Sequence, residues 1–253
     1  FLLLVWLTAT ACAADDSPAD RLVIGAAGVS EARPLQLNGA DGRRQLLATS
    51  LNQQQVIGDL THTATWSSGD TSIVRVDRGL VTVVGNGQTD VTVRHGALAA
   101  SIAVHVQGAD LRPAVSFRHE VLAALSRLSC SSGACHGSPT GKGGFRLSLR
   151  GFDPELDRTT LVREDQGRRT NPFDPAKSLV LLKPLMKTPH GGGLRLRTSD
   201  PEYDLLSRWI GQGLPDDTES ERSCLGIEVA PASRRLHWPN IRQQISVLAR
   251  FSD

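Results

Sequence analysis

The sequence predicts a multidomain chain in which an all-β sandwich is followed by a small, mostly α-helical domain and then by the first strands of a second β-domain. Residues 21–107 contain short strand patterns with turn signals about every eight to twelve residues. Between residues 110 and 218 the spacing of the apolar residues becomes helical. Residues 225–253 return to strand patterns. The length of 253 residues agrees with about two domains or slightly more.

The composition excludes some classes of protein and partner. The chain has 28 Lys and Arg against 26 Asp and Glu, which gives a net charge of +2, and no basic block stands apart from acidic residues. We therefore expect no nucleic acid partner. Hydrophobic residues make up 40% and aromatic residues 4% of the chain, which fits β-rich modules and excludes disorder throughout.

Residues 1–14 predict part of a secretory signal peptide. This apolar run is shorter than the roughly 20 residues that a membrane span needs, and it ends in small residues before the acidic pair at 15–16. We expect an exported protein, periplasmic or at the cell surface, with no transmembrane helix. A buried strand or helix is the alternative, and lipid attachment at Cys12 is a weaker one. Because no initiator Met or basic region precedes the run, we expect a truncated N-terminus.

The strand pattern of residues 21–107 agrees with a known module. A DLT turn at 59–61 and a WSS stretch at 66–68 are followed by VRVDRGLVTVVGNGQTDVTV at 74–93. This order resembles the bacterial immunoglobulin-like (Ig-like) domain of group 2, which implies a spacer or adhesive module of surface proteins. We expect Trp66 to anchor the core of this domain. Parts of residues 225–253 echo its opening, so we expect the start of a second, truncated Ig-like domain there, with a chance likeness as the alternative.

Residues 110–218 are expected to hold two helices around a loop-rich middle. Ser116 can cap the first helix, and the second starts at Asp200 with Pro201 in its first turn and ends at Gly213. Each helix places apolar residues on one face: Val121, Leu122, Leu125 and Leu128 on the first, and Tyr203, Leu206, Trp209 and Ile210 on the second.

The first of these helices leads into the motif that carries chemistry, Cys130-Ser-Ser-Gly-Ala-Cys135-His136. Covalent haem attachment needs two thiols that add to the vinyl groups and an imidazole that binds the iron. The usual spacing is C-x-x-C-H, and the longer C-x-x-x-x-C-H found here is a variant in which Gly133 is expected to let the extra residues loop out. A disulfide between Cys130 and Cys135 is the alternative. A zinc site would need two more soft ligands.

Several further motifs follow in a fixed order over about 100 residues. Residues 115–215 resemble the planctomycete-type cytochrome c domain that lies between Ig-like modules in large exported proteins. The resemblance implies one covalent haem c per chain, bound by Cys130 and Cys135, with His136 as an iron ligand. The matching segments are SCSSGACHG (129–137), GKGGFRLSLRGFDPELD (141–157), GRRTNPFDPAKSLVLLKP (167–184), PHGGG (189–193) and LLSRWIGQGLP (205–215).

Two residues compete for the second axial position on the iron. The family pattern carries a ligand just before a Gly-rich turn, which favours His190, whereas Met186 is the only Met of the chain and remains the alternative. A pair of histidines predicts a lower reduction potential than a His/Met pair.

Other polar residues have plainer interpretations. Arg146, Arg150, Arg168 and Arg169 could meet the haem propionates, but they alternate with acidic residues, so we expect a solvated face of mixed charge. His119 is expected at the surface. Cys224 has no evident partner, which indicates a buried inert thiol or a bond to another chain.

The leading functional hypothesis is electron transfer, in which an Ig-like spacer presents a one-haem domain to a redox partner protein or to a downstream domain of the same full-length chain. No catalytic triad or paired carboxylate site is present, so we do not expect this fragment to be an enzyme. The first rival is a structural or adhesive surface protein with a Cys130–Cys135 disulfide. The second is a haem sensor or enzyme centre with an open coordination site.

Overall fold

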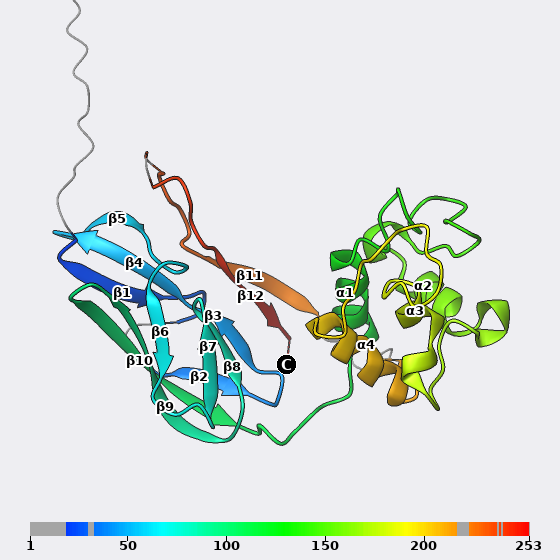
Figure 1. The fold of residues 1–253 in the computed structure, drawn as a ribbon, viewed down its shortest axis with the longest axis horizontal. Helices are drawn as coiled ribbons and strands as arrows, with labels where there is room; N and C mark the ends of the chain where they lie inside the picture. The colour runs from blue at the N-terminus through cyan, green and yellow to red at the C-terminus, as the bar shows by residue number, and fades with distance from the viewer. Residues whose placement is uncertain (1–18, 30–32, 217–222, 237, 239, 253) are drawn as a thin grey trace, which may run out of the picture. The chain divides into compact units, whose positions relative to one another are not determined.

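The computed structural model describes residues 19–29, 33–216, 223–236, 238 and 240–252. The chain divides into two compact units, one formed by residues 1–112 with 222–253 and the other by residues 113–221 (Figure 1). The predicted signal peptide at 1–14, including Cys12, lies outside the described residues.

The first unit is built from β-strands, as the sequence predicts. Its strands form a three-stranded sheet in the order β1-β4-β5, a four-stranded sheet in the order β2-β10-β9-β6 and a three-stranded sheet in the order β3-β8-β7. The strands are β1 Arg21–Gly25, β2 Leu35–Asn38, β3 Arg43–Gln45, β4 Leu47–Asn52, β5 Gln55–Asp59, β6 Thr65–Ser68, β7 Val74–Asp77, β8 Leu80–Val83, β9 Gly87–His95 and β10 Leu98–Gln107.

The sheets of this unit share one hydrophobic core. Val74, Val81, Val91, Val93 and Val104 are fully buried in it, each from a strand in which apolar and polar residues alternate. The apolar residues that recur at every second position of these strands point into the core. The β-rich fold that this pattern predicts is confirmed.

Two local features of the first unit were also predicted correctly. The turn between β7 and β8 has Arg78 and Gly79 at φ +46° and +79°, which is the conformation of a two-residue hairpin turn. Trp66 packs against the core and donates its Nε1–H to the carbonyl of Thr61 at 2.9 Å. Trp66 is thus a core anchor, as expected.

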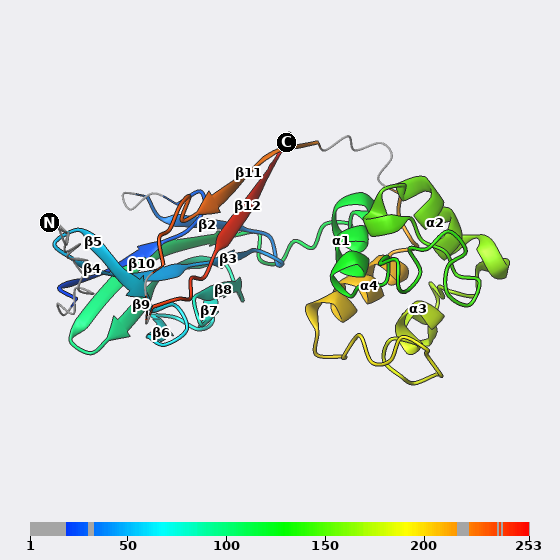
Figure 2. The same ribbon diagram turned by 90° about the horizontal axis from the view of Figure 1, so that it is seen from above.

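The tail residues pair with each other and contact the first unit. Strand β11, Cys224–Ala230, runs antiparallel to β12, Ser246–Phe251, and the two lie side by side in both ribbon views (Figures 1 and 2). Ser246 Oγ donates to the carbonyl of Gln45 at 2.8 Å and accepts from the backbone N–H of Ala27 at 3.3 Å. The start of a second Ig-like domain in this segment stays a prediction.

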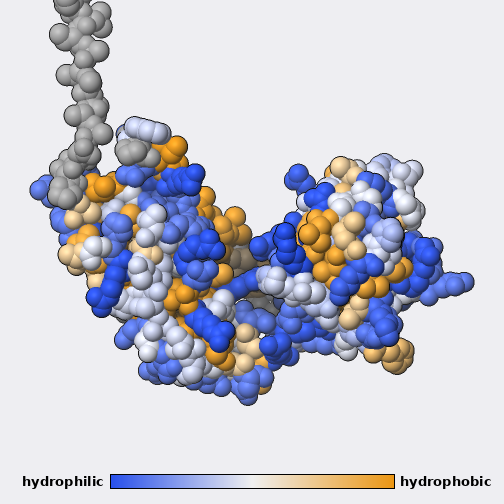
Figure 3. Space-filling view, in the orientation of Figure 1, coloured by the Kyte–Doolittle hydropathy of each residue, from blue (hydrophilic) through white to orange (hydrophobic). Residues whose placement is uncertain are grey.

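The second unit is helical. Its helices and helical turns are η1 Phe117–Val121, α1 Leu122–Arg127, η2 Leu149–Gly151, α2 Pro154–Val162, η3 Glu164–Gly167, η4 Pro175–Lys177, α3 Leu179–Leu182 and α4 Pro201–Gly211. Charged and polar side chains cover much of the face shown in Figure 3, with apolar side chains between them.

The two helices that the sequence predicts form the core of this unit. Ser116 Oγ accepts from the backbone N–H of His119 at 3.0 Å, which caps the first helical segment, and α4 starts at Pro201 as expected. The rings of Phe117 and Trp209 lie 5.3 Å apart at the centre of this core, and both side chains are buried.

The loop-rich middle contains a helix that the sequence interpretation missed. Helix α2 begins at Pro154, and the Asp153 side chain accepts from the backbone N–H of Leu156 at 3.1 Å. An Asp followed by Pro is a known start signal for a helix, so the information was present in the sequence.

Candidate functional site

The second unit contains an open cavity of about 190 Å³. All four predicted haem-binding residues, Cys130, Cys135, His136 and His190, line this cavity. Its apolar lining includes Leu128, Phe145, Leu179, Val180 and Pro184, and its charged lining consists of Lys142, Asp165, Arg168, Arg169, Lys183 and Arg195. An apolar pocket with a few convergent polar groups is the usual form of a cofactor site.

The segment between the two cysteines is a closed loop. It follows α1 directly, where the backbone N–H of Cys130 donates to the carbonyl of Leu125 at 2.8 Å. The N–H of His136 then donates to the carbonyl of Cys130 at 3.0 Å, so the backbone returns to its starting point within seven residues. The four residues between the cysteines are therefore accommodated by backbone turns, and the thiols and the imidazole reach one cavity.

One glycine of this loop is required by close packing. A Cβ at Gly137 would lie 2.2 Å from the carbonyl oxygen of Ser131. Gly133, which the sequence interpretation expected to be needed, would place a Cβ in open space, and its φ is not positive. That expectation was wrong: the close approach is at Gly137, and Ser129, at φ +63°, takes the left-handed conformation.

The two thiols are free and lie at the wall of the cavity. Burial and, to a smaller extent, the neighbouring Cys135 thiol raise the pKa of Cys130 to about 11, while the charge of Arg195 opposes the rise. Cys130 is therefore a protonated thiol at neutral pH. Because disulfide exchange proceeds through the thiolate, this environment slows oxidation at Cys130.

The ring of His136 is fixed by a backbone carbonyl. Its Nδ1 lies 2.8 Å from the carbonyl oxygen of Phe145, and since a carbonyl can only accept, Nδ1 carries the proton. Burial lowers the pKa of His136, partly offset by this hydrogen bond, so the ring favours the neutral form. Nε2 is then an unprotonated nitrogen, which is the form that binds a metal.

His190 has a similar hydrogen bond. Its Nδ1 lies 2.8 Å from the carbonyl oxygen of Gly193, so Nδ1 is the donor and, in the neutral ring, Nε2 is the nitrogen that can bind a metal. A Cβ at Gly192 would lie 2.8 Å from Cε1 of His190, so the Gly-rich turn is shaped around the ring. The ring is thereby held by its own turn.

The separation of the two rings tests whether they fit a shared iron. Their centroids lie 6.4 Å apart and their planes differ by 15°. A metal–imidazole bond of about 2.0 Å and a nitrogen-to-centroid distance of about 1.1 Å place the centroids of two imidazoles that bind one metal ion in line about 6.2 Å apart. The observed separation is close to this value, so it is compatible with two imidazoles on one metal ion.

Met186 does not take part in this arrangement. Its side chain is 49% exposed, and it is not among the residues of the cavity wall. The structure brings His190, and not Met186, to the cavity that His136 lines.

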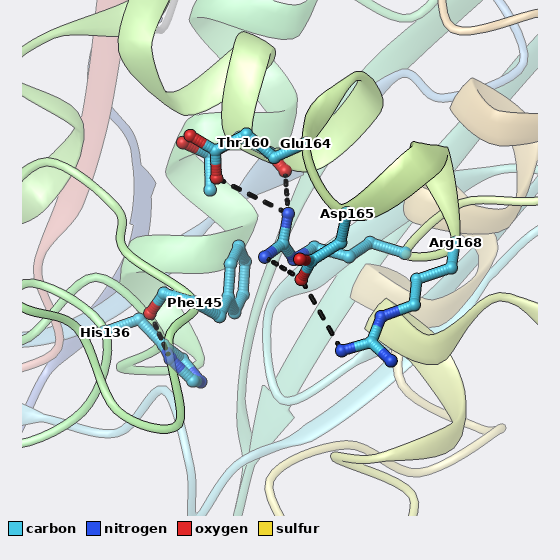
Figure 4. A network of polar contacts seen from close by, with 7 residues as sticks. His136, Phe145, Thr160, Glu164, Asp165 and Arg168 are labelled. Atoms are coloured by element: carbon cyan, nitrogen blue, oxygen red, sulfur yellow. Dashed lines mark hydrogen bonds and ion pairs between the residues drawn. The ribbon is translucent and has the colours of Figure 1, made fainter.

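The four arginines of the predicted mixed-charge face do not behave alike. Arg146, Arg150 and Arg168 are exposed, as expected. The prediction was wrong for Arg169, which is 7% exposed because its guanidinium packs 4.9 Å from the ring centroid of Phe145 and pairs with Glu164 and Asp165 (Figure 4).

Two further residues of the site were missed from the sequence. Phe145 contacts the ring of His136, with ring centroids 4.4 Å apart, and Lys142 donates to the carbonyl of Gly191 at 3.3 Å. The only signal was their position in the Gly-rich segment that follows the motif. A Cβ at Gly141, whose φ is +64°, would lie 2.1 Å from the Phe145 carbonyl oxygen, so this glycine permits the turn that returns Phe145 to His136.

His119 and Cys224 are not among the residues that line the cavity. His119 is half-buried on η1 instead of exposed, and it does not line the cavity. Cys224 is exposed, so the expectation of a buried thiol was wrong, and a bond to another chain stays a prediction. Within the described residues, no three His, Cys, Asp or Glu side chains are grouped closely enough to hold a metal ion.

Comparison with known proteins identifies no family for this chain. No family model and no curated protein matches the chain. Among solved structures, the chain is similar to one described as the crystal structure of an intimin–Tir90 complex, with 24% identity over 34% of this chain and 46% of that one and a TM-score of 0.25. The match therefore spans less than half of the solved chain. No helix in the described part of the chain is long and apolar enough to span a membrane.

Proposed function

We propose that residues 113–216 form a c-type cytochrome domain that binds one haem c and transfers electrons. Thioether bonds from Cys130 and Cys135 would hold the haem, and the Nε2 atoms of His136 and His190 would bind its iron. The observation that carries this proposal is the pair of imidazoles at 6.4 Å, each with Nδ1 at a backbone carbonyl, on one cavity with two free thiols.

The residues of the chain would each have a definite task. When bound, haem c supplies a one-electron couple between ferric and ferrous iron. The carbonyls of Phe145 and Gly193 hold the two imidazoles in the tautomer that can bind, and they increase the basicity of both rings. The apolar wall around Leu128 and Val180 excludes water from the cavity, which affects the reduction potential.

The rest of the chain would give this domain its setting. Covalent haem attachment takes place outside the cytoplasm, which agrees with the expected secretory signal at residues 1–14. The β-unit of residues 21–107 would serve as an Ig-like spacer or interaction module of an exported protein, in the periplasm or at the cell surface. Its redox partner would be a second protein or a downstream domain of the same full-length chain.

A pyridine haemochrome assay tests the proposal. The full chain is produced with haem-maturation machinery in an exporting host, beside the double variant Cys130→Ala/Cys135→Ala. We expect a c-type haemochrome spectrum from the unmodified chain and no covalently retained haem from the double variant. A colourless unmodified chain with its two thiols joined as a disulfide would contradict the proposal and would favour a structural or adhesive surface protein.

Carbon monoxide binding separates electron transfer from the remaining alternative. If both axial positions are filled by histidines, the reduced protein should bind carbon monoxide weakly or slowly. Rapid, stoichiometric binding would indicate an open coordination site and hence a haem sensor or enzyme centre.

A further inference from the structure

Arg169 is a buried cation of the helical unit. Its guanidinium contacts the ring of Phe145, and this ring contacts the imidazole of His136. Only 8% of its side chain is exposed, compared with 67% for its neighbour Arg168. Burying a guanidinium is costly unless its N–H groups and its charge are satisfied. The structure therefore has to provide partners for Arg169, and these partners identify what the residue does.

The guanidinium of Arg169 forms hydrogen bonds and ion pairs within the protein. Nη1 donates to the carbonyl oxygen of Thr160 at 2.6 Å and pairs with Glu164 at 3.5 Å, and Nη2 donates to Asp165 at 2.6 Å (Figure 4). This fork ties α2 to η3 in a single orientation. These contacts use three of the five N–H groups of Arg169 for bonds within the protein.

The face of the guanidinium contacts an aromatic ring. The Cζ atom of Arg169 lies 4.9 Å from the ring centroid of Phe145, which is the distance of a cation–π contact. The other neighbour of this ring is His136, whose centroid lies 4.4 Å away at an interplanar angle of 48°. The ring of Phe145 thus contacts both the guanidinium and the imidazole.

The backbone of Phe145 connects this packing to the imidazole. Its carbonyl accepts the Nδ1–H of His136, and this hydrogen bond sets the rotation of the ring about the bond that Nε2 would form. A shift of Phe145 would move both the ring and the carbonyl that hold His136. We infer that Arg169 is a positioning residue that, through Phe145, fixes the plane of His136 nearly parallel to that of His190.

The inference rests on the proposed function, in which His136 and His190 bind the haem iron. One readout of the test uses the haem-loaded protein and the other uses the haem-free protein. The variants are Arg169→Gln and Phe145→Leu in the full chain, with Arg146→Gln as the matched control, because this change removes the same charge from an exposed residue that does not line the cavity. Arg169→Lys keeps the positive charge but not the planar fork, and it serves if Arg169→Gln does not fold.

The first readout is the electron paramagnetic resonance spectrum of the ferric, haem-loaded protein. Nearly parallel imidazole planes give a rhombic low-spin signal, and rotation of one ring toward the perpendicular gives a strongly axial one. We expect Arg169→Gln, Arg169→Lys and Phe145→Leu to lose the rhombic signal and Arg146→Gln to keep it. The double variant Phe145→Leu/Arg169→Gln should resemble the single ones, since the two residues act in series.

The second readout is the Nδ1–H resonance of His136 in the haem-free protein. We expect slow exchange of this proton in the unmodified chain and in Arg146→Gln, and its loss by fast exchange in the Arg169 and Phe145 variants. If no chain retains haem, the proposed function fails while this readout still decides the role of Arg169. Unchanged spectra in Arg169→Lys, or equal changes in Arg146→Gln, would overturn the inference.

Discussion

The ring centroids of His136 and His190 lie 6.4 Å apart, and the planes of the two imidazoles are only 15° from parallel. In the sequence, 53 residues lie between these two histidines. Each ring holds its Nδ1 at 2.8 Å from a backbone carbonyl oxygen. Both therefore present Nε2 as the nitrogen that is free to bind a metal, which is the basis of the first prediction.

Replacing His190 should change the iron ligation, and replacing Met186 should not. In the haem-loaded full chain, His190→Ala removes a ring that faces His136, so we expect loss of the ferric low-spin spectrum and a gain of rapid carbon monoxide binding after reduction. Met186→Ala changes a side chain that is 49% exposed, and the visible spectrum should remain as it is. The opposite pattern in the two variants would assign the second axial ligand to Met186.

A methyl group at Gly137 should disrupt the loop that carries the thiols. In Gly137→Ala the new Cβ would lie 2.2 Å from the carbonyl oxygen of Ser131, so backbone has to move. We expect a loss of about 2 kcal/mol or more in the free energy of unfolding of the helical unit, and a lower yield of attached haem. Calorimetry of the full chain would measure the first effect.

Gly133→Ala is the matched control, because it adds the same methyl group to the same loop. Its Cβ would meet nothing within 4 Å, so the free energy of unfolding should change by no more than about 0.5 kcal/mol. Equal destabilisation by both variants would show that glycine is needed at 133 as well.

The helical unit should depend strongly on its buried aromatic pair. Phe117 is 1% exposed and contacts Trp209, so Phe117→Ala should lower the free energy of unfolding by about 3 to 5 kcal/mol. Phe173, which is 100% exposed, provides the comparison, since Phe173→Ala removes no buried contact. A similar loss in both variants, measured by denaturant unfolding, would contradict the described core.

The buried carboxyl of Asp157 should make the stability of the helical unit depend on pH. Burial raises its pKa, the hydrogen bonds from the backbone N–H and Oγ of Ser148 oppose the rise, and the charge of Asp153 adds to it. The folded state therefore binds the proton more tightly than the unfolded state does. The resulting stabilisation is present below the ordinary Asp pKa of 3.8 and is lost as the pH rises through the higher pKa of the folded state.

Asp157→Asn should remove this contribution. Unfolding of the helical unit, followed between acidic and neutral pH, should lose less stability with rising pH in Asp157→Asn than in the unmodified chain. Asp204→Asn, at an exposed residue of α4, is the control and should keep the original pH dependence. No difference between the two variants would contradict the assignment.

Sequence patterns predicted the parts of the fold that depend on local periodicity. The alternation around Val74 and Val91 gave buried strands, and the Ser116 cap and Asp200-Pro201 start marked the two main helices correctly. Helix α2 was missed although Asp153-Pro154 begins it in the same manner, because the segment lacks a strong apolar face.

The parts of the site that were not predicted depend on tertiary contacts. Arg169 lies in a run of alternating charges that is typical of a solvated surface, and it is buried by the ring of Phe145, the carbonyl of Thr160 and its two acidic partners. Phe145 in turn reaches His136 because Gly141 turns the backbone at φ +64°. Contacts of this kind depend on how distant segments pack and leave no periodic signal.

The intact mass of the denatured chain tests the central claim most directly. The account predicts that the exported, matured protein keeps the added mass of one haem after unfolding in acid, and that Cys130→Ala/Cys135→Ala loses it. A chain without added haem, lighter than its reduced form by two hydrogen atoms because Cys130 and Cys135 are joined, would contradict the account.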